Sequence, residues 1–344
     1  MTAPPFVIFG LPRSRTAWLT QWLRLASGGA RIGHDLAIEA DTIDGWLENV
    51  YRRVRGTCET GAVEAWPILR QAIPDCRIVT VHRDVTDVAG SLMLAGAPAP
   101  MDDLNRRAMA LQELSEQPGV VSIAFAGLAD PRLCADLQEH CLSVPFNWQA
   151  WRCMETCNVQ VDMPTRLARL AERADAIAAL KAEIAERLVT PRPFVTVGEE
   201  RWVDVADACE ALGRVHHVEA TENREGQFKL NREAMDTLNR NGMMRAFIAR
   251  VNSEVAGYCA WTHHISIDAD MLPTMLQGAF YIAPQFAGHR LGIRLLRVSR
   301  ETLSADGYKV LKPHHTMHGR GCRAGALYRY LGAEESSREY IWRI

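Results

Sequence analysis

The sequence contains little lysine, no long apolar run and almost no excess of charge. Only four of its 39 basic residues are lysine, and 41 acidic residues leave a net charge of −2. A chain without a global basic field does not have the composition of a nucleic-acid-binding or membrane-surface protein. No run of about 18 apolar residues occurs, so we expect no membrane span. The first residues carry no signal-peptide pattern, so we also expect no export signal.

Cysteine occurs nine times, an odd number, and never with the Cys-x-x-Cys spacing of a structural zinc site. This usage predicts reduced thiols in a cytoplasmic protein. One region, residues 134–157, gathers four cysteines and His140, and a zinc site there is the alternative. Because its spacing fits buried helical positions better, we expect no metal.

Short apolar runs rich in β-branched residues alternate with helical patterns in the first half of the chain. Strands that alternate with helices predict an α/β fold with a mostly parallel sheet. The expected strands are 6–9, 77–81 and 120–125, and the helices that follow them are 17–25, 85–94 and 131–141.

A change of pattern divides the chain. Residues 164–188 have apolar positions at three- and four-residue spacing, which predicts one long amphipathic helix. The helix should end before Pro191. From residue 194 strands and helices begin again, with a hairpin turn expected at Asn252-Ser253. We therefore predict a first domain at 1–160, a helical linker at 161–190 and a second domain at 191–344.

The first strand leads into Gly10-Leu11-Pro12-Arg13-Ser14-Arg15-Thr16-Ala17 and then into a helix. Such a loop cradles an anion with backbone N–H groups at a helix N-terminus. A nucleoside-triphosphate loop ends in glycine, lysine and a hydroxyl residue. Here Arg15, Thr16 and Ala17 hold those positions, and Ala17 has no hydroxyl for magnesium, so an ordinary ATPase is disfavoured.

The same loop resembles the phosphosulfate loop of sulfotransferases, through Pro12, Arg13, Ser14, Thr16 and Trp18. Arg83, with Ser91 eight residues on, resembles the family's second signature, which grips the donor's 3′-phosphate. The resemblance covers about residues 6–160. It implies a sulfotransferase-like P-loop domain that transfers a sulfuryl group from 3′-phosphoadenosine 5′-phosphosulfate to a hydroxyl acceptor. The donor-binding residues that it implies are Gly10, Pro12, Arg13, Ser14, Arg15, Thr16, Arg83 and Ser91.

Two questions about this domain stay open. The loop is also similar to loops of small bacteriophage-associated domains, some of them kinases that act on modified bases, so ATP is the alternative donor. Either transfer needs a base for the acceptor hydroxyl. His34, followed by Asp35, is the candidate because the sulfotransferase base lies between the two motifs. A His-Asp pair is equally compatible with a helix cap or a surface pair.

A second anion-binding pattern lies in the C-terminal half. A strand at 278–282, the loop 285–292 and a helix at 293–305 follow one another. This order resembles the acetyl-CoA site of the GNAT superfamily of N-acetyltransferases and implies an α+β domain with a mixed sheet. The loop keeps Gly292 but has Ala287 and Arg290 where the superfamily has other residues. The cofactor-binding residues implied are Phe280, Tyr281, Ile282, Gly288, His289, Arg290, Leu291 and Gly292.

The residues 324–332 resemble the superfamily's late Leu-Tyr-x-x-Leu-Gly segment. That resemblance assigns Tyr328 the protonation of the departing CoA thiolate; simple core packing is the alternative. A phage-associated branch carries a His-x-Glu element, matched here by His217-Val218-Glu219, which makes Glu219 the candidate base for the acceptor amine. The pairs His263-His264 and His314-His315 are further candidates.

Two hypotheses follow. The first is a two-domain transferase in the cytoplasm, or the host cytoplasm if phage-encoded. Its acceptor is a small molecule, a polysaccharide or a modified nucleobase, with nucleic acid only as substrate. The second is a non-catalytic phage protein that reuses both folds, which the altered loop positions Arg15, Ala17, Ala287 and Arg290 favour. The sequence leaves the oligomeric state open.

Overall fold

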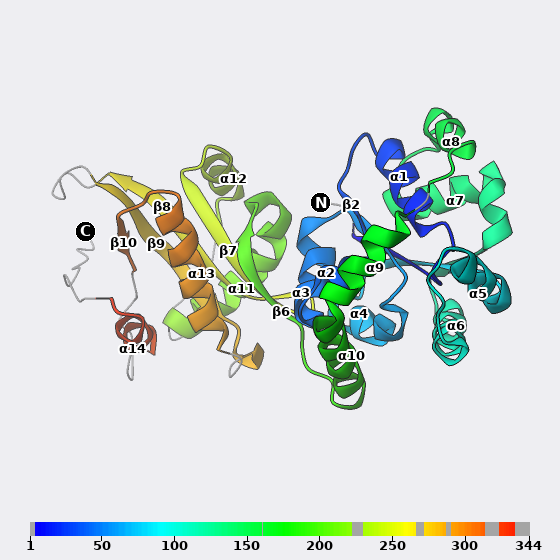
Figure 1. Cartoon of the computed structure of the whole chain (residues 1–344). Helices are drawn as coiled ribbons and strands as arrows, with labels where there is room; N and C mark the ends of the chain where they lie inside the picture. Colours follow the sequence, from blue (N-terminus) through cyan, green and yellow to red (C-terminus); the bar gives the residue numbers. More distant parts are fainter. Residues whose placement is uncertain are drawn as a thin grey trace, which may run out of the picture. The chain divides into compact units, whose positions relative to one another are not determined.

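The computed structural model describes residues 4–159, 161–221, 230–265, 272–286, 290–313 and 323–333, with backbone only at 219–221, 265, 323, 324 and 326. The chain forms two compact units that divide between Phe194 and Val195 (Figure 1). The predicted fold class is confirmed, since the first unit holds a parallel sheet flanked by helices and the second holds a mixed sheet.

The first unit is built on a five-stranded parallel sheet with the order β2-β3-β1-β4-β5. All side chains of the central strand β1 are buried, as expected for a strand covered on both faces. The direction of strand addition reverses beside β1, and such a switch point opens a crevice at the carboxyl ends of the strands. The strands are β1 (Phe6–Gly10), β2 (Ile32–His34), β3 (Gly56–Glu59), β4 (Arg77–His82) and β5 (Val120–Ala124).

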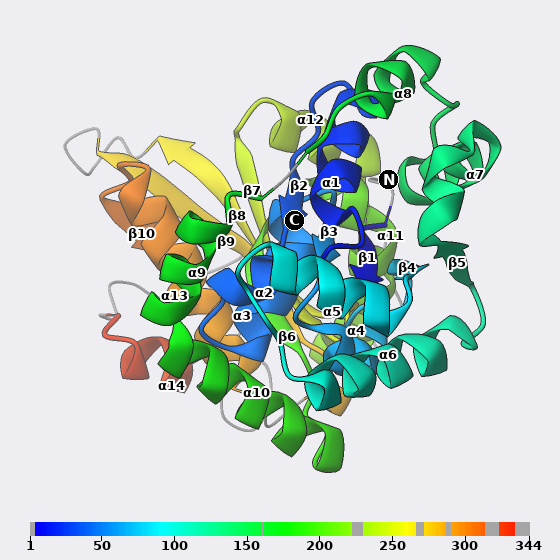
Figure 2. The same cartoon turned by 45° about the vertical axis from the view of Figure 1, so that its right-hand side comes forward.

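Helices cover both faces of this sheet. One face packs against α1, α7 and α8 through a tryptophan-rich core that includes Trp18, Trp22 and Trp151. The other face carries the remaining helices, among which α5 and α6 lie side by side (Figure 2). The helices are α1 (Thr16–Ala26), α2 (Leu36–Glu39), α3 (Ile43–Glu48), α4 (Trp66–Ala72), α5 (Val85–Leu94), α6 (Met101–Ser115), α7 (Pro131–Leu142) and α8 (Trp148–Glu155). Shorter helical turns are Asn49–Arg53, Val63–Ala65 and Phe125–Ala129.

The segment predicted as one long helix forms two helices, α9 (Met163–Glu172) and α10 (Ala174–Val189). The break is at Arg173, whose φ of −101° and ψ of 9° leave the helical region. At this break the guanidinium of Arg173 donates to the carbonyls of Ile38 and Ala40. Both helices belong to the first unit in the structure.

The second unit holds a five-stranded sheet with the order β10-β9-β8-β7-β6. Its pairs are antiparallel except for β9 and β10, which run parallel. The predicted hairpin turn is confirmed, because Asn252 and Ser253 have the positive φ angles of a tight two-residue turn between β7 and β8. The strands are β6 (Val195–Glu200), β7 (Met244–Val251), β8 (Glu254–Ile265), β9 (Pro273–Ile282) and β10 (Val310–Lys312).

Helices cover both faces of the second sheet as well. The helices α11 (Trp202–Thr221) and α12 (Arg232–Arg240) pack on one face. The other face carries α13 (Leu291–Ala305) and α14 (Arg323–Tyr330), with a helical turn at Pro284–Phe286 before them. Within the described part of the chain, no helix has the length and apolar character needed to cross a membrane.

Candidate functional site

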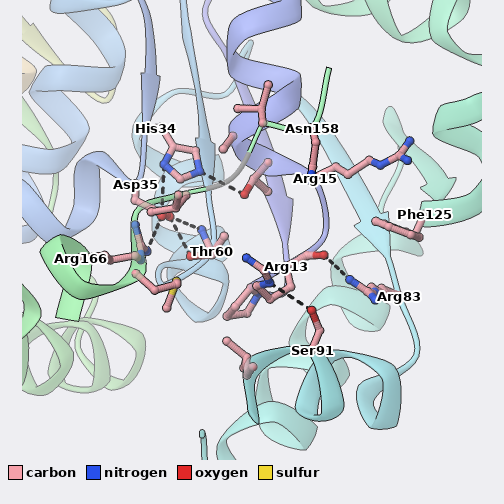
Figure 3. A pocket seen from close by; sticks show the side chains of 17 residues that line it. Arg13, Arg15, His34, Asp35, Thr60, Arg83, Ser91, Phe125, Asn158 and Arg166 are labelled. Carbon is pink, nitrogen blue, oxygen red and sulfur yellow. Dashed lines mark hydrogen bonds and ion pairs between the residues drawn. The ribbon is translucent and has the colours of Figure 1, made fainter. Parts of the chain in front are cut away.

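A cavity of about 320 Å³ lies at the carboxyl ends of the strands in the first unit (Figure 3). Every strand of the sheet sends a residue into it from its carboxyl end, as expected at a topological switch point. The lining residues are Pro12, Arg13, Arg15, Thr16, Ala17, His34, Asp35, Thr60, Arg83, Ser91, Leu92, Phe125, Asn158, Val159, Val161, Met163 and Arg166. The predicted phosphate loop, the second signature and the candidate base therefore share one cavity.

The loop between Gly10 and α1, predicted to bind an anion, contains two residues in the left-handed conformation. Arg13 and Arg15 have φ angles of 66° and 60°, and Arg15 caps the first turn of α1 in the left-handed conformation. The hydroxyl of Ser14 is fully buried beside them and has no hydrogen-bond partner among the described residues. A buried hydroxyl without a partner is costly.

Two arginines connect the loop to the second signature. Arg13 Nε donates to the hydroxyl of Ser91 at 3.1 Å, and Arg83 Nη1 donates to the carbonyl oxygen of Arg13. The guanidinium of Arg83 lies 4.4 Å from the ring centre of Phe125, and that of Arg15 lies 5.3 Å from it. No described carboxylate pairs with these three guanidinium groups. Their uncompensated charge favours a ligand with more than one negative group.

His34 lies on the opposite side of the cavity at the end of β2 (Figure 3). Its Nε2 is 3.1 Å from the hydroxyl of Thr16, and its Nδ1 is 3.5 Å from the carboxylate of Asp35. Burial lowers the pKa of His34 below its usual value, because desolvation disfavours the charged imidazolium. A neutral imidazole that faces the phosphate loop is suited to accept a proton.

The sequence patterns missed several residues of this cavity. Arg166, Asn158 and Val159 reach it from a segment more than a hundred residues beyond the loop, and Phe125 reaches it from the end of β5. The only sequence signal for Phe125 is its place at the carboxyl end of a predicted strand, where ligand-binding residues gather in parallel sheets. Nothing local to Arg166 distinguishes it from its helical neighbours.

The second unit has a different arrangement at the end of β9. Within the described residues, β9 pairs with β10 through Thr274, Met275 and Leu276, six residues before the end of β9. A bulge at Gly278 follows, because Ala279 pairs with Ala260 while Gln277 pairs with Trp261. The last residues of β9 thus lie past the described part of β10.

The N-terminus of α13 meets this end of β9. Arg290 caps the helix with a φ of 53°. A Cβ atom at Gly292 would lie 3.3 Å from Phe280 and 3.4 Å from Leu327, so the glycine lets the helix approach the strand closely. Phe280 and Ile282 face the α13 side of the sheet, and Tyr281 faces the α11 side. The predicted loop residues Gly288 and His289 lie outside the described residues, while Leu291 is buried.

Tyr328 lies buried in α14 beneath the sheet. Its hydroxyl donates to Gln277 Oε1 at 2.6 Å, and its ring centre is 6.4 Å from that of Phe280. The structure therefore brings Tyr328, β9 and the start of α13 together. The role assigned to Tyr328 stays a prediction.

The other histidine and glutamate candidates are less closely gathered. The side chain of Glu219 and the pair His314-His315 lie outside what the structure describes. His263 packs on Tyr308, 5.9 Å between ring centres, away from the start of α13. His217 is half-buried on α11.

The neighbouring His216, which the sequence did not single out, faces the sheet. Its ring stacks on Tyr281 with 4.6 Å between ring centres and 16° between planes. The hydroxyl of Tyr258 lies 3.5 Å from His216 Nδ1. Only the rotation of α11 about its axis decides that His216, rather than His217, lies over the end of β9.

No protein-family model and no curated protein matches this sequence. Several solved structures resemble the C-terminal 44% of the chain. A ribosomal-protein-alanine N-acetyltransferase from Brucella melitensis biovar Abortus 2308 is 15% identical, with a TM-score of 0.36 over 44% of this chain and 99% of that one. An aminoglycoside acetyltransferase from an uncultured soil metagenomic sample, in complex with sisomicin, is 12% identical, with a TM-score of 0.37 over 44% and 97%. A possible acetyltransferase from Clostridium difficile 630 is 14% identical, with a TM-score of 0.37 over 44% and 97%.

Proposed function

We propose that this protein is a transferase with two domains. The N-terminal domain transfers a sulfuryl group from 3′-phosphoadenosine 5′-phosphosulfate to a hydroxyl acceptor. The C-terminal domain, of the GNAT type, transfers an acetyl group from acetyl-CoA to an amine. Each reaction is argued from its own unit, and the tests below address them separately.

One observation carries the N-terminal proposal. Arg13, Arg15 and Arg83 line one cavity at the N-terminus of α1, and no described carboxylate pairs with their guanidinium groups. Ser91 lines the same cavity, and its hydroxyl accepts a hydrogen bond from Arg13 Nε. A sulfate donor with separate 5′ and 3′ anionic groups fits these hydrogen-bonding groups. One anionic group would bind at the start of α1 and the other near Ser91.

The choice of a sulfate donor over ATP rests on the carboxylates and hydroxyls of the cavity. Magnesium, which accompanies ATP, prefers carboxylate and hydroxyl oxygens. Ala17 stands at the position where a nucleotide loop has its metal-binding hydroxyl. Asp35 is the one carboxylate among the described lining residues, and Arg166 and Thr60 already bind it. Sulfuryl transfer needs no such metal ligand.

The residues of the cavity divide the work of that transfer. His34 Nε2 accepts the proton of the acceptor hydroxyl, whose oxygen attacks the sulfur atom. The bond between sulfur and the 5′-phosphate oxygen then breaks, and the negative charge that develops on this oxygen is stabilised by Arg13, Arg83 and the amides at the start of α1.

Thermal unfolding with each donor tests this proposal. We expect 3′-phosphoadenosine 5′-phosphate, the product left by the donor, to raise the unfolding temperature of the first unit. ATP with magnesium should have a much smaller effect at the same concentration. Stabilisation by ATP with magnesium alone would favour the kinase alternative and refute the sulfate donor.

The geometry of the second unit supports the acetyltransferase proposal. The described pairing with β10 ends at Leu276, and α13 begins against the end of β9. This arrangement provides a strand end for the pantetheine and a helix N-terminus for the pyrophosphate of acetyl-CoA. Tyr328 is the proposed acid for the thiolate. Glu219 remains the proposed base for the amine, with His216 as the residue that the structure adds.

Titration calorimetry with acetyl-CoA tests this second proposal. Gly292→Trp places a large side chain where a Cβ atom alone would be 3.3 Å from Phe280, so we expect it to abolish binding. Glu301→Trp puts the same side chain on an exposed position of the same helix and is the control. Binding that is absent from the native protein, or equal in both variants, would favour the non-catalytic hypothesis for this domain.

A further inference from the structure

We propose that Asp35 and Arg166 are positioning residues for His34. The carboxylate of Asp35 orients the imidazole so that Nε2 faces the predicted phosphate loop as the proton acceptor. Arg166 pairs with the same carboxylate and so weakens its attraction for a proton on the imidazole. The inference rests on the proposed sulfuryl transfer for its catalytic meaning. Its structural content, the control of His34 by one shared carboxylate oxygen, can be measured without that reaction.

The contacts of His34 define its orientation (Figure 3). Nδ1 faces Asp35 Oδ2 at 3.5 Å, and Nε2 faces Thr16 Oγ1 at 3.1 Å. A ring nitrogen that faces a carboxylate carries the proton, which leaves the other nitrogen as an acceptor. Thr16 is the first residue of α1, so Nε2 is directed toward the place where the transferred group would be bound.

Asp35 is held in place independently of His34. Its backbone has a φ of 52°, and its N–H donates to the carbonyl oxygen of Cys58. Its Oδ1 accepts from the Thr60 amide at 2.7 Å and the Thr60 hydroxyl at 2.8 Å. The carboxylate is 3% exposed, so its other oxygen is directed at His34 and Arg166 rather than at solvent.

Arg166 shares that oxygen, with Nη2 at 2.5 Å from Asp35 Oδ2. Arg166 belongs to α9, a helix with no fully buried side chain. Arg166 and Arg169 of α9, and Arg173 directly after it, each pair with a carboxylate of the segment after β2. The other two pairs, Arg169 with Glu39 and Arg173 with Asp41, lie outside the cavity. Arg166 is therefore the residue of α9 whose charge reaches His34.

Two further titratable groups lie near the imidazole, Glu59 and Arg24. Glu59 is buried beside Asp35 and accepts from the amides of Leu36 and Ala37. Arg24, from α1, donates to the carbonyl oxygen of Ile32. Burial is the largest influence on the pKa of His34 and lowers it, Asp35 raises it, and Arg166 and Arg24 lower it. Removing Asp35 or Arg166 should therefore shift the pKa in opposite directions.

The reaction uses this balance in two stages. Before the transfer, burial and Arg166 keep His34 neutral, so that Nε2 can accept a proton. When the acceptor hydroxyl passes its proton to Nε2, the ring becomes an imidazolium, and the carboxylate of Asp35 stabilises the new charge. The proton leaves to solvent after the product departs, which restores the neutral ring.

Nuclear magnetic resonance titration of ¹⁵N-histidine-labelled full chain tests the proposal, with His34 assigned from the spectrum of His34→Gln. We expect Arg166→Gln to raise the pKa of His34 by about one unit and Asp35→Asn to lower it by about one unit. The control Arg169→Gln removes an exposed arginine of the same helix and should leave it unchanged. The ¹⁵N shifts should show Nε2 unprotonated in the native protein and a mixture of tautomers in Asp35→Asn. No change, or shifts in the same direction in both variants, would overturn the proposal.

Kinetics separate this inference from the proposed function. With sulfuryl transfer measured, the acidic limb of the kcat profile should move to higher pH in Arg166→Gln, while the KM for the donor stays within about twofold. Transfer with an unmoved limb would refute the positioning roles and keep the function. Opposite pKa shifts without any transfer would support the positioning roles and refute the function. Circular dichroism melts confirm that each variant is folded.

Discussion

Arg83 offers the sharpest test of the donor site. Its Nη1 donates to the Arg13 carbonyl oxygen and its guanidinium stacks on Phe125, so two contacts fix its direction. Its Nε is buried and has no hydrogen-bond partner among the described residues. In the proposed complex the Arg83 guanidinium donates hydrogen bonds to a phosphate of 3′-phosphoadenosine 5′-phosphosulfate. Arg83→Gln removes the charge and the fork of donors, whereas Arg83→Lys keeps only the charge.

The size of the effect follows from these contacts. A hydrogen bond to a charged group contributes about 1.5–3 kcal/mol, and a buried donor left without a partner costs a similar amount. Losing this contact should weaken binding by about 2–3 kcal/mol, which is about 30- to 150-fold in Kd. Arg83→Lys should lose about tenfold, because a point charge replaces the planar fork.

Titration calorimetry with 3′-phosphoadenosine 5′-phosphate measures the change without turnover. Arg132→Gln, an exposed arginine in the first turn of α7, is the matched control and should bind like the native protein. Arg83→Gln also loses its bond to the Arg13 carbonyl, so melts must show that it is folded at the assay temperature. Binding by Arg83→Gln within threefold of the control would refute the placement of the donor.

Three further predictions address burial, pH and the second unit. Burial and Asp35 raise the pKa of Glu59 to about 8, above its unfolded value of 4.5. The contribution of Glu59 to folding stability is therefore present below pH 4.5 and is lost as the pH rises through 8. Urea unfolding at pH 5 and pH 9 should show that loss in the native protein and a smaller one in Glu59→Gln; equal slopes would contradict it. Tyr328→Phe removes the hydroxyl that donates to Gln277 and should lower the free energy of unfolding by about 1 kcal/mol. It should also lower the kcat of acetyl transfer and change the KM less. An unchanged kcat would mean that Tyr328 serves only in core packing. His216→Phe keeps the stacking on Tyr281, so it should preserve acetyl-CoA affinity and lower the rate of amine acetylation; an unchanged rate would remove His216 from the site.

Much of the first unit could be predicted because its signals are local. An apolar run followed by Gly10 and a polar loop specifies a buried strand that ends at an anion-binding turn, whatever surrounds it. Arg83 directly follows β4, and Ser91, eight residues on, lies in the second half of the next helix, α5. The structure brings both motifs into one cavity, where Arg13 contacts Ser91.

The interruption at Arg173 shows where local signals stop. The apolar positions of residues 164–188 continue without a break in the sequence, and no glycine or proline marks one. At the break, the side chain of Arg173 donates to the carbonyls of Ile38 and Ala40, more than 130 residues earlier in the chain. A periodic pattern contains no information about such distant partners.

By itself, the sequence predicted several strands and helices and two candidate anion-binding loops, because such patterns depend on neighbours within a few residues. Only the tertiary structure decided which side chains meet. Arg166 reaches Asp35 across 131 residues, and His216 rather than His217 faces Tyr281. The physical reason is that such contacts depend on how whole helices pack and rotate against a sheet, which residues far apart in the chain determine together.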